Sequence, residues 1–589
     1  MKKLKWTRKL VLWRQKGDND YYLFVLSSVI VGLLTGLGAV VLKNSVNFVH
    51  EQILPLSNQS TGKWFYFVFP FVGFMLTYLY LKITKLEVKS GVPNLLFSIS
   101  RNSGYLKPHN VFSSIVGSIL TVGFGGSAGL EGPNISTGGG LASLVSRFFK
   151  LPYKRRMLLL GVASAGTISA IFKAPITGII FALEVIMIDL TTLSVIPIVL
   201  ASVTASLTSF WFTGNNFLYN LDFVPAFELS EVPIYILMGI ITGFFGLFFS
   251  KIYNWFVRFF SKIKYLFVRF LIAGISVGIL IFIFPAIFAE GYQALNTSLD
   301  SNYSYLLEND VFSEFNDNIP LIIILFLVIA VVKIVATSIT IAAGGIGGFF
   351  TPILFVGANL GLFISHLFER LGFNVFHKSS TLVAMGGLIA AMFHAPLTSV
   401  FFVGELTGGY SLLVPLLITC SVSFIVIRIF QKNNFFSQQL AEQKILMTHH
   451  ADQNILNMLR MKDLVECNFI TIAPDKKLGD LVEVVKETRR DLFPVIDCEN
   501  RFIGVISLNR IRKIMFKTEL HDKISVSELM IFPDIYADID EHLEDVAEKF
   551  EKSQRYNLLI LDKSKYVGFI SRSNFFAHYR KLLKEFSEE

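Results

Sequence analysis

The stretch Gly129-Leu-Glu-Gly-Pro133 places one carboxylate, that of Glu131, between glycines inside an apolar region of the chain. Two other stretches, Gly347-Gly-Phe-Phe-Thr-Pro352 and Lys89-Ser-Gly-Val-Pro93, also combine glycine and proline in apolar surroundings. In each stretch glycine permits a close approach of the backbone, and proline suits the first turn of a helix. The three stretches therefore predict three helix N-termini at membrane depth, where unpaired N–H groups and the positive end of the helix dipole attract anions.

Two of these stretches, 129–133 and 347–352, belong to an internal repeat of about 220 residues, because segments broken by Gly and Pro recur in the same order. At an offset of 219, Gly125, Gly126, Gly129 and Pro133 match Gly344, Gly345, Gly348 and Pro352. At an offset of 221, Phe172, Ala174, Pro175, Thr177, Phe181 and Glu184 match Phe393, Ala395, Pro396, Thr398, Phe402 and Glu405. Broken segments at corresponding positions of two halves indicate a transporter's binding site. The sequence leaves open whether the repeat is inverted.

The composition divides the chain into an apolar body and a charged tail. Of the 589 residues, 53% are hydrophobic and only 16% are charged, and 49 of the 97 charged residues fall in residues 441–589. Soluble domains carry roughly 25% charged residues. Residues 1–440 are therefore too apolar for a soluble protein, whereas the tail is typical of one. The 58 phenylalanines also exclude a disordered chain.

The distribution of positive charge predicts the orientation in the membrane. Residues 1–16 contain seven Lys and Arg and no acid, and the apolar run Tyr22–Leu42 is long enough for a spanning helix rather than a signal peptide. Because basic residues favour the cytoplasmic side, we expect both termini in the cytosol and the body in the lipid of the cytoplasmic membrane. The same bias explains the net charge of +9 without a nucleic-acid partner.

Glu131 is the candidate gate. Ionisable residues inside a membrane are costly and usually functional. A carboxylate at an anion-binding helix end can occupy the anion's own place, and protonation frees it to leave. Glu131 is therefore predicted to compete with the permeant ion and to sense pH. The simpler alternative is a carboxylate that only caps its helix.

Together these motifs resemble the CLC family of chloride channels and chloride/proton exchangers, followed by a pair of CBS domains. The resemblance rests on Ser90-Gly-Val-Pro93, on 129–133 and 347–352, and on Ala174–Gly178 followed by Glu184. It implies an all-α polytopic membrane domain with an inverted repeat plus an α/β cytoplasmic CBS pair. It also implies a homodimer that moves chloride or similar small anions through one pore per subunit, and no enzyme. The predicted regions are a basic N-terminus (1–20), the transmembrane domain (21–440, with halves 22–215 and 230–440), a linker (441–458) and two CBS domains (459–520 and 521–585).

The resemblance also implies residue roles. Glu131 corresponds to the external gating glutamate. Ser90, a serine as in chloride-selecting members, would give its hydroxyl to the central anion, although it could equally be a plain helix cap. The predicted anion-binding residues are Ser90, Gly91, Gly129, Gly132, Gly348, Phe349, Phe350 and Phe436.

Two departures from the family pattern bear on proton coupling. Exchangers carry an internal glutamate directly after the position of Glu184, where this chain has Val185. The family's anion-binding tyrosine aligns with Phe436, which has no hydroxyl donor. We therefore favour a channel or a weakly coupled carrier, and a coupled antiporter that uses water in place of the glutamate stays open. A divalent-cation transporter with CBS domains is disfavoured because the broken segments offer chiefly Glu131 as an acid.

Three further expectations concern polar residues. Glu184 and Glu405 are predicted to be structural carboxylates bonded to backbone. In the tail, Gly504-Val-Ile-Ser507 recurs as Gly568-Phe-Ile-Ser571, which predicts two packed units of strand, helix, strand, turn, strand and helix. CBS pairs that bind adenine nucleotides carry an acid three residues after each Ser, but Ser507 is followed by Arg510 and Ser571 by Asn574. We thus favour a scaffold over a nucleotide site, and expect no metal site and no required cofactor.

Overall fold

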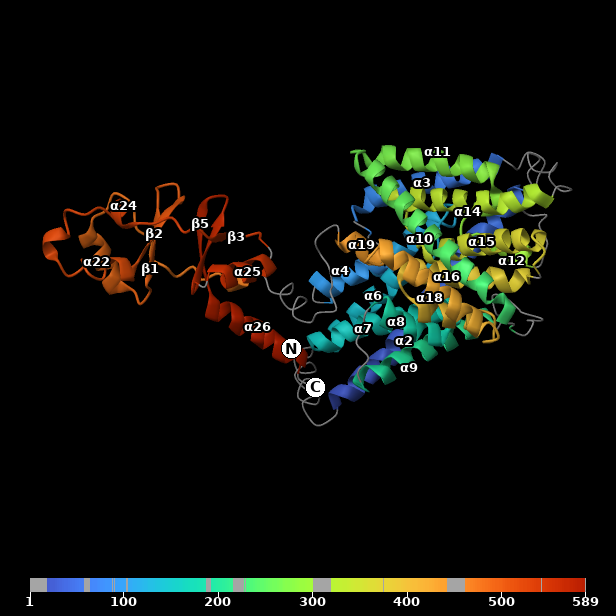
Figure 1. Ribbon diagram of the computed structural model, residues 1–589, viewed down its shortest axis with the longest axis horizontal. Helices are drawn as coiled ribbons and strands as arrows, with labels where there is room; N and C mark the ends of the chain where they lie inside the picture. The colour runs from blue at the N-terminus through green and yellow to red at the C-terminus, as the bar shows by residue number, and fades with distance from the viewer. Residues whose placement is uncertain are drawn as a thin grey trace. The chain divides into compact units, whose positions relative to one another are not determined.

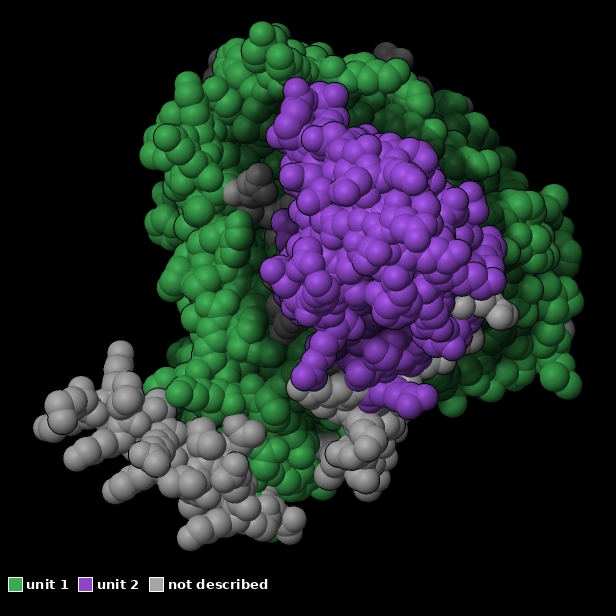
Figure 2. Space-filling model, turned by 90° about the vertical axis from the view of Figure 1, so that its left-hand side faces the viewer, with its two compact units in different colours: residues 1–446 green, residues 447–589 purple. Residues whose placement is uncertain are grey.

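The computed structural model describes residues 19–57, 64–86, 88, 91–101, 104–186, 192–214, 227, 229–299, 319–373, 375–441, 461–541, 543–553 and 555–587. The chain forms two compact units, residues 1–446 and 447–589 (Figure 2). The basic residues 1–18 and all of the predicted linker except Ala441 lie outside the described residues.

Unit 1 is built from helices (Figure 1). The first half contains α2 (Asn19–Ser57), α3 (Phe65–Thr84), α4 (Val92–Arg101), α5 (Asn110–Thr121), α6 (Glu131–Phe148), α7 (Tyr153–Phe172), α8 (Pro175–Glu184) and α9 (Thr192–Thr213). The second half contains η2 (Leu229–Glu231), α10 (Val232–Ser261), α11 (Leu266–Ile283), η3 (Pro285–Ile287), α12 (Tyr292–Leu299), α14 (Ile319–Ala342), α15 (Phe350–Arg370), α16 (His377–Phe393), α17 (Pro396–Leu406), α18 (Leu413–Phe430) and α19 (Phe435–Ala441). Within the described ranges, nine helices are long and apolar enough to span a membrane, which confirms the predicted polytopic body.

The two halves meet through equivalent residues. Gly129 N–H donates to the Gly348 carbonyl at 2.8 Å, and Gly348 N–H donates to the Gly129 carbonyl at 2.7 Å. Two repeat mates that exchange identical hydrogen bonds lie on opposite sides of a pseudo-twofold axis, as in an isologous interface. The glycine before each motif has a left-handed backbone, with φ of 101° at Gly125 and 113° at Gly344, which explains why a glycine recurs there.

The carboxylates of Glu184 and Glu405 cap helices of the opposite half. Glu405, near the end of α17, accepts hydrogen bonds from the backbone N–H groups of Ile176 (2.9 Å) and Thr177 (2.7 Å) at the start of α8. Glu184, at the end of α8, accepts the same bonds from the start of α17, at Leu397 (3.2 Å) and Thr398 (2.7 Å). The predicted carboxylate–backbone bonding is confirmed. Each helix ends where the other begins, so α8 and α17 are antiparallel and the repeat is inverted.

Unit 2 contains two small α/β units. In the first, β1 (Leu492–Ile496) pairs with β2 (Phe502–Ser507) antiparallel, and the strand predicted before α22 (Leu478–Glu487) is reduced to a single bridge between Ile472 and Val495. In the second, β4 (Asn557–Asp562) lies between β3 (Tyr536–Asp538), which is parallel to it, and β5 (Lys565–Ser571), which is antiparallel. Short helices complete the units: α21 (Met461–Leu464), α23 (Leu508–Ile511), η5 (Thr518–Leu520), α24 (Val526–Leu529), α25 (Leu543–Ser553) and α26 (Arg572–Ser587).

The two α/β units pack on each other through a shared apolar cluster. Side chains of both units form it: Phe469, Phe502, Val505, Leu559, Leu561 and Phe569. This confirms the prediction that the two units of the tail pack together.

Candidate functional site

Four helix N-termini surround one cavity of about 70 Å³ in unit 1. The cavity exceeds the roughly 10–15 Å³ that one water molecule requires. Its lining comes from the starts of α4, α6, α15 and α19, with further side chains from α8, α10 and α14; the residues are Gly91, Val92, Pro93, Glu131, Gly132, Ile135, Phe181, Tyr253, Ile341, Gly347, Gly348, Phe349, Phe350 and Phe436. Figure 1 shows α4 beside α6 and α19. The sequence predicted three of these N-termini, and α19 supplies a fourth.

The helix starts give the cavity its electrostatic character. The first N–H groups of a helix have no acceptor within the helix, and the dipole adds a partial positive charge there. The lining residues, all within the described part of the chain, include no Lys or Arg. The cavity therefore offers an anion partial positive charges without a full opposing charge.

Glu131 is the only ionisable side chain among these lining residues other than Tyr253, and it is 2% exposed. Its Oε1 accepts a hydrogen bond from the hydroxyl of Thr351, the second residue of α15. Its Oε2 has no hydrogen-bond partner within the described residues. The Glu131 side chain thus joins the first turn of α6 to the first turn of α15. Its second carboxylate oxygen is left without a hydrogen bond in the cavity wall.

Two glycines leave room for this carboxylate. A Cβ atom on Gly129 would lie 2.2 Å from Glu131 Oε2, and a Cβ atom on Gly348 would lie 3.0 Å from the same oxygen. Both distances are shorter than an ordinary contact. At Gly129 a side chain would displace Glu131, and at Gly348 it would also come within 2.7 Å of the Gly132 backbone nitrogen.

The other predicted anion-binding residues fall into four groups. Ser90 lies outside the described residues. Gly91 and Gly348 line the cavity, but their N–H groups already donate to Ser136 Oγ (2.7 Å) and to the Gly129 carbonyl. Gly132, Phe349, Phe350 and Phe436 line the cavity as well. Gly129 is not among the lining residues, and its N–H donates to the Gly348 carbonyl, so the prediction that it binds the anion is not supported.

An aromatic wall holds the start of α15. The ring of Phe349 packs against Tyr253 of α10, with centroids 4.8 Å apart, and against Phe435 at 4.6 Å. Phe436 stacks on Phe393 at 4.8 Å. The sequence pointed to a missing tyrosine at Phe436 but not to Tyr253, which lies in a different helix of the same wall and carries no motif of its own.

Val185 is fully buried at the C-cap of α8, directly after the capping carboxylate of Glu184. The position therefore places an apolar side chain where the resemblance would put an internal proton carrier.

A second, smaller cavity of about 20 Å³ has Leu130 in its lining. Its polar lining includes Lys43, Asn134, Glu290 and Tyr292. The Tyr292 hydroxyl is 3.2 Å from Thr351 Oγ1, so a chain of hydroxyl groups leads from this cavity to Glu131. Sequence reasoning missed this chain because its members are separated by more than 50 residues.

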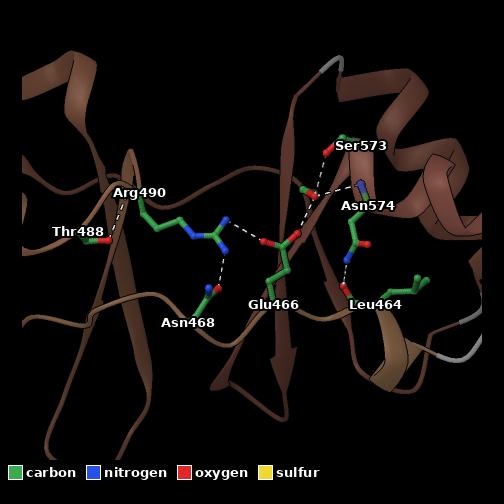
Figure 3. A network of polar contacts seen from close by, with 8 residues as sticks. Leu464, Glu466, Asn468, Thr488, Arg490, Ser573 and Asn574 are labelled. Carbon is green, nitrogen blue, oxygen red and sulfur yellow. Dashed lines mark hydrogen bonds and ion pairs between the residues drawn. The ribbon is translucent and has the colours of Figure 1, made fainter.

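In unit 2, two of the three candidate nucleotide residues, Ser571 and Asn574, are bonded to protein groups (Figure 3 labels Asn574 and its partner Leu464). Ser571 donates its hydroxyl hydrogen bond to Glu466 Oε1 (2.7 Å), and Asn574 Nδ2 donates to the Leu464 carbonyl (3.1 Å). Arg490, from the first α/β unit, forms an ion pair with Glu466 Oε2 at 2.8 Å. The network ties the two α/β units together. The third, Ser507, is the N-cap residue of α23, and its side chain makes no capping hydrogen bond there.

Comparisons with known proteins agree with this architecture. Residues 72–428 match the family model described as voltage gated chloride channel, and residues 461–517 and 526–581 match that of the CBS domain. The H(+)/Cl(−) exchange transporter ClcA of Klebsiella pneumoniae is 26% identical over 454 residues, which cover 73% of this chain and 90% of that protein. The ClcA of Yersinia pestis is 25% identical over 426 residues, covering 68% and 84%.

Solved structures show the same fold. The structure of a slow cyanobacterial Cl−/H+ antiporter aligns with a TM-score of 0.62 at 21% identity and covers 72% of this chain and 98% of that one. That of a eukaryotic CLC transporter aligns with a TM-score of 0.59 at 16% identity and covers 94% and 98%.

Proposed function

Since the chain belongs to the voltage-gated chloride channel (CLC) family and carries two CBS domains, we propose that it conducts chloride through one pore in each subunit of a homodimer in the cytoplasmic membrane. The convergence of four helix N-termini on one cavity carries the proposal. These helix ends replace part of the water that a chloride ion loses on entering.

The absence of Lys and Arg from the described lining suits transport rather than storage. Conduction requires binding that is strong enough for entry and weak enough for release. Partial charges at helix ends, supplemented by polar hydrogens, meet both requirements. We propose that Tyr253 contributes to this wall in place of the hydroxyl that Phe436 lacks.

Glu131 is proposed as the gate. As an ionised carboxylate it occupies the anion's position, tethered to α15 by Thr351. Protonation removes the negative charge, weakens the tether and lets the side chain leave, so that chloride enters. Acid on the side that reaches Glu131 therefore opens the pore.

Proton coupling is proposed to be weak. Val185 is buried and cannot exchange a proton, so a proton that reaches Glu131 has no carboxyl group at that position to receive it. A coupled chloride/proton antiporter is the second candidate, because the ClcA relatives are named H(+)/Cl(−) exchange transporters. In that case water would carry the proton past Val185.

The CBS pair is proposed to act as a scaffold that does not require adenine nucleotide. The hydroxyl of Ser571 and the amide of Asn574 are already bonded to Glu466 and Leu464. A ribose would have to displace these partners.

Chloride efflux from liposomes containing the purified protein, with external pH recorded at the same time, tests the proposal. We expect chloride flux without matched proton movement. Protons driven uphill by the chloride gradient would establish the antiporter instead, and the absence of chloride flux from folded protein would refute both.

Glu131→Gln tests the gate in the same assay. Glutamine has nearly the shape of glutamate but no charge, so we expect flux at neutral pH at least as high as that of the native protein and a flat pH profile. A variant that keeps the native pH dependence would remove Glu131 from the mechanism.

A further inference from the structure

Two histidines and a glutamate meet where α15 ends and α16 begins, away from the anion cavity. His366 and Glu369 lie one turn apart near the end of α15, and His377 is the first residue of α16. One ligand atom from each lies within 4.8 Å of the other two. Imidazole and carboxylate are common ligands of Zn²⁺ and related divalent ions.

The tautomer of His377 directs a lone pair at the carboxylate. Ser365 donates its hydroxyl hydrogen to the Leu362 carbonyl at 3.0 Å, so its oxygen is left to accept from His377 Nδ1 at 2.9 Å. The other nitrogen, Nε2, lies 3.2 Å from Glu369 Oε2. In a neutral imidazole with a proton on Nδ1, Nε2 is an acceptor. Two acceptors at this distance require a cation between them, either a proton or a metal ion.

Two of the three ligand separations fit a metal ion, and the rings of His366 and His377, whose centroids are 4.0 Å apart, would have to turn for both nitrogens to bind it. Zn²⁺ binds histidine nitrogen and carboxylate oxygen at about 2.0–2.2 Å in tetrahedral geometry, so neighbouring ligand atoms lie about 3.3–3.5 Å apart. Glu369 Oε2 is 3.2 Å from His377 Nε2 and 3.4 Å from His366 Nδ1. Both nitrogen–oxygen separations are thus close to an edge of the tetrahedron.

The surroundings hold the ligands and leave an entry path. Phe326 of α14 lies parallel to the His366 ring, with an angle of 3° between the planes. Ser365 fixes the His377 ring from its other nitrogen, as hydrogen-bonding partners commonly do for metal-binding histidines. The side chain of Glu369 is 59% exposed, so an ion can reach the cluster from solvent.

We propose that His366, Glu369 and His377 bind one Zn²⁺ or a similar borderline divalent ion, with water as a fourth ligand. Sequence analysis expected no metal site, because the three ligands carry no motif and the third belongs to another helix. The ion would join the end of α15 to the start of α16. Because α15 also begins at Phe350 in the anion cavity, the metal would restrain the far end of a helix that builds the pore.

Zinc binding by the full-length protein in detergent tests the proposal. The protein is prepared without a polyhistidine tag, treated with chelator, and titrated with Zn²⁺ against a chromophoric competitor. We expect one Zn²⁺ per chain. His377→Gln and Glu369→Gln should each weaken zinc binding by more than about tenfold. Loss of a residue that only supports a metal ligand already costs roughly 10- to 100-fold in metal affinity, and loss of the ligand itself should cost at least as much.

Two further variants separate a metal site from an ordinary ion pair. Ser365→Ala leaves all three ligands but removes the partner of His377 Nδ1, so zinc affinity should fall by roughly tenfold or more. His578→Gln, an exposed histidine of α26, should leave affinity unchanged. Size-exclusion profiles verify that each variant is folded.

Cobalt gives an independent readout. Co²⁺ bound to the native protein should show the intense visible absorption of a four-coordinate site, and His377→Gln should abolish it. Equal zinc affinity of the native protein and His377→Gln, or no zinc bound at all, would overturn the proposal and leave a protonated His377 paired with Glu369.

Discussion

Replacing Thr351 by valine removes the hydrogen bond to Glu131 and changes the side chain's size little. Thr351 is buried, and its hydroxyl is the side-chain group that bonds Glu131 Oε1. A hydrogen bond to a charged group contributes roughly 1.5–3 kcal/mol. Each 1.4 kcal/mol is a factor of ten in an equilibrium constant. The equilibrium constant for placing the ionised carboxylate in its closed position should therefore fall roughly 10- to 150-fold.

The sign of the effect on pH dependence follows from which form is stabilised. The hydroxyl hydrogen bonds more strongly to the ionised carboxylate than to the neutral acid. Removing it makes protonation easier, so the pore should open at higher pH. The flux midpoint should rise by about one to two pH units, because one unit corresponds to 1.36 kcal/mol.

Chloride efflux from liposomes, measured over a series of pH values, gives this midpoint. Thr381→Val is the matched control, since the Thr381 hydroxyl bonds the His377 carbonyl within its own helix at 2.7 Å. Superimposable pH profiles of Thr351→Val and the native protein would refute the role of the tether. A shift of equal size in Thr381→Val would show that the effect is not local.

Four other substitutions test further contacts. Gly348→Ala places a methyl group 2.7 Å from the Gly132 backbone nitrogen and 3.0 Å from Glu131 Oε2. The methyl crowds the cavity wall, so chloride efflux should fall at least about tenfold without loss of the folded peak in size exclusion. Glu405→Ala leaves the start of α8 uncapped and should lower the free energy of unfolding by at least about 2 kcal/mol, measured by thermal unfolding. Glu184→Ala removes the equivalent cap of α17 and should destabilise the protein by a similar amount. The Tyr566 hydroxyl is largely buried, which raises its pKa, and it has no hydrogen-bond partner among the described residues. Tyr566→Phe removes this unpaired polar group, so the free energy of opening β5 should rise by about 1 kcal/mol and hydrogen exchange there should slow. Faster exchange would contradict this.

The helix starts could be predicted from the sequence because their requirements are local. Glycine at Gly129 and Gly348 and proline four residues later are signals that a short stretch carries by itself. The orientation of the repeat could not be predicted in this way, because an offset of 219 is the same for parallel and inverted halves. It became evident only when Glu184 and Glu405 were seen to cap each other's helices.

The partners of Glu131 could not be predicted for a related reason. Thr351 is part of the 347–352 motif, but its hydrogen bond to Glu131 joins residues 220 positions apart. Tyr253 enters the cavity wall from α10, an apolar and aromatic helix in which no motif marks this residue. Side chains from unrelated segments converge through packing, which neither periodicity nor spacing encodes.

The reciprocal caps have a consequence for biosynthesis. The start of α8 at Thr177 obtains its capping carboxylate from a residue 228 positions later. At translation rates of about 5–20 residues per second, Glu405 emerges about 11–46 s after Thr177. During that interval α8 must wait in the translocon or the lipid with exposed N–H groups, so the first half stays incomplete until the second half is nearly made. Truncated chains that end between the two positions should therefore be substrates for membrane quality-control proteases.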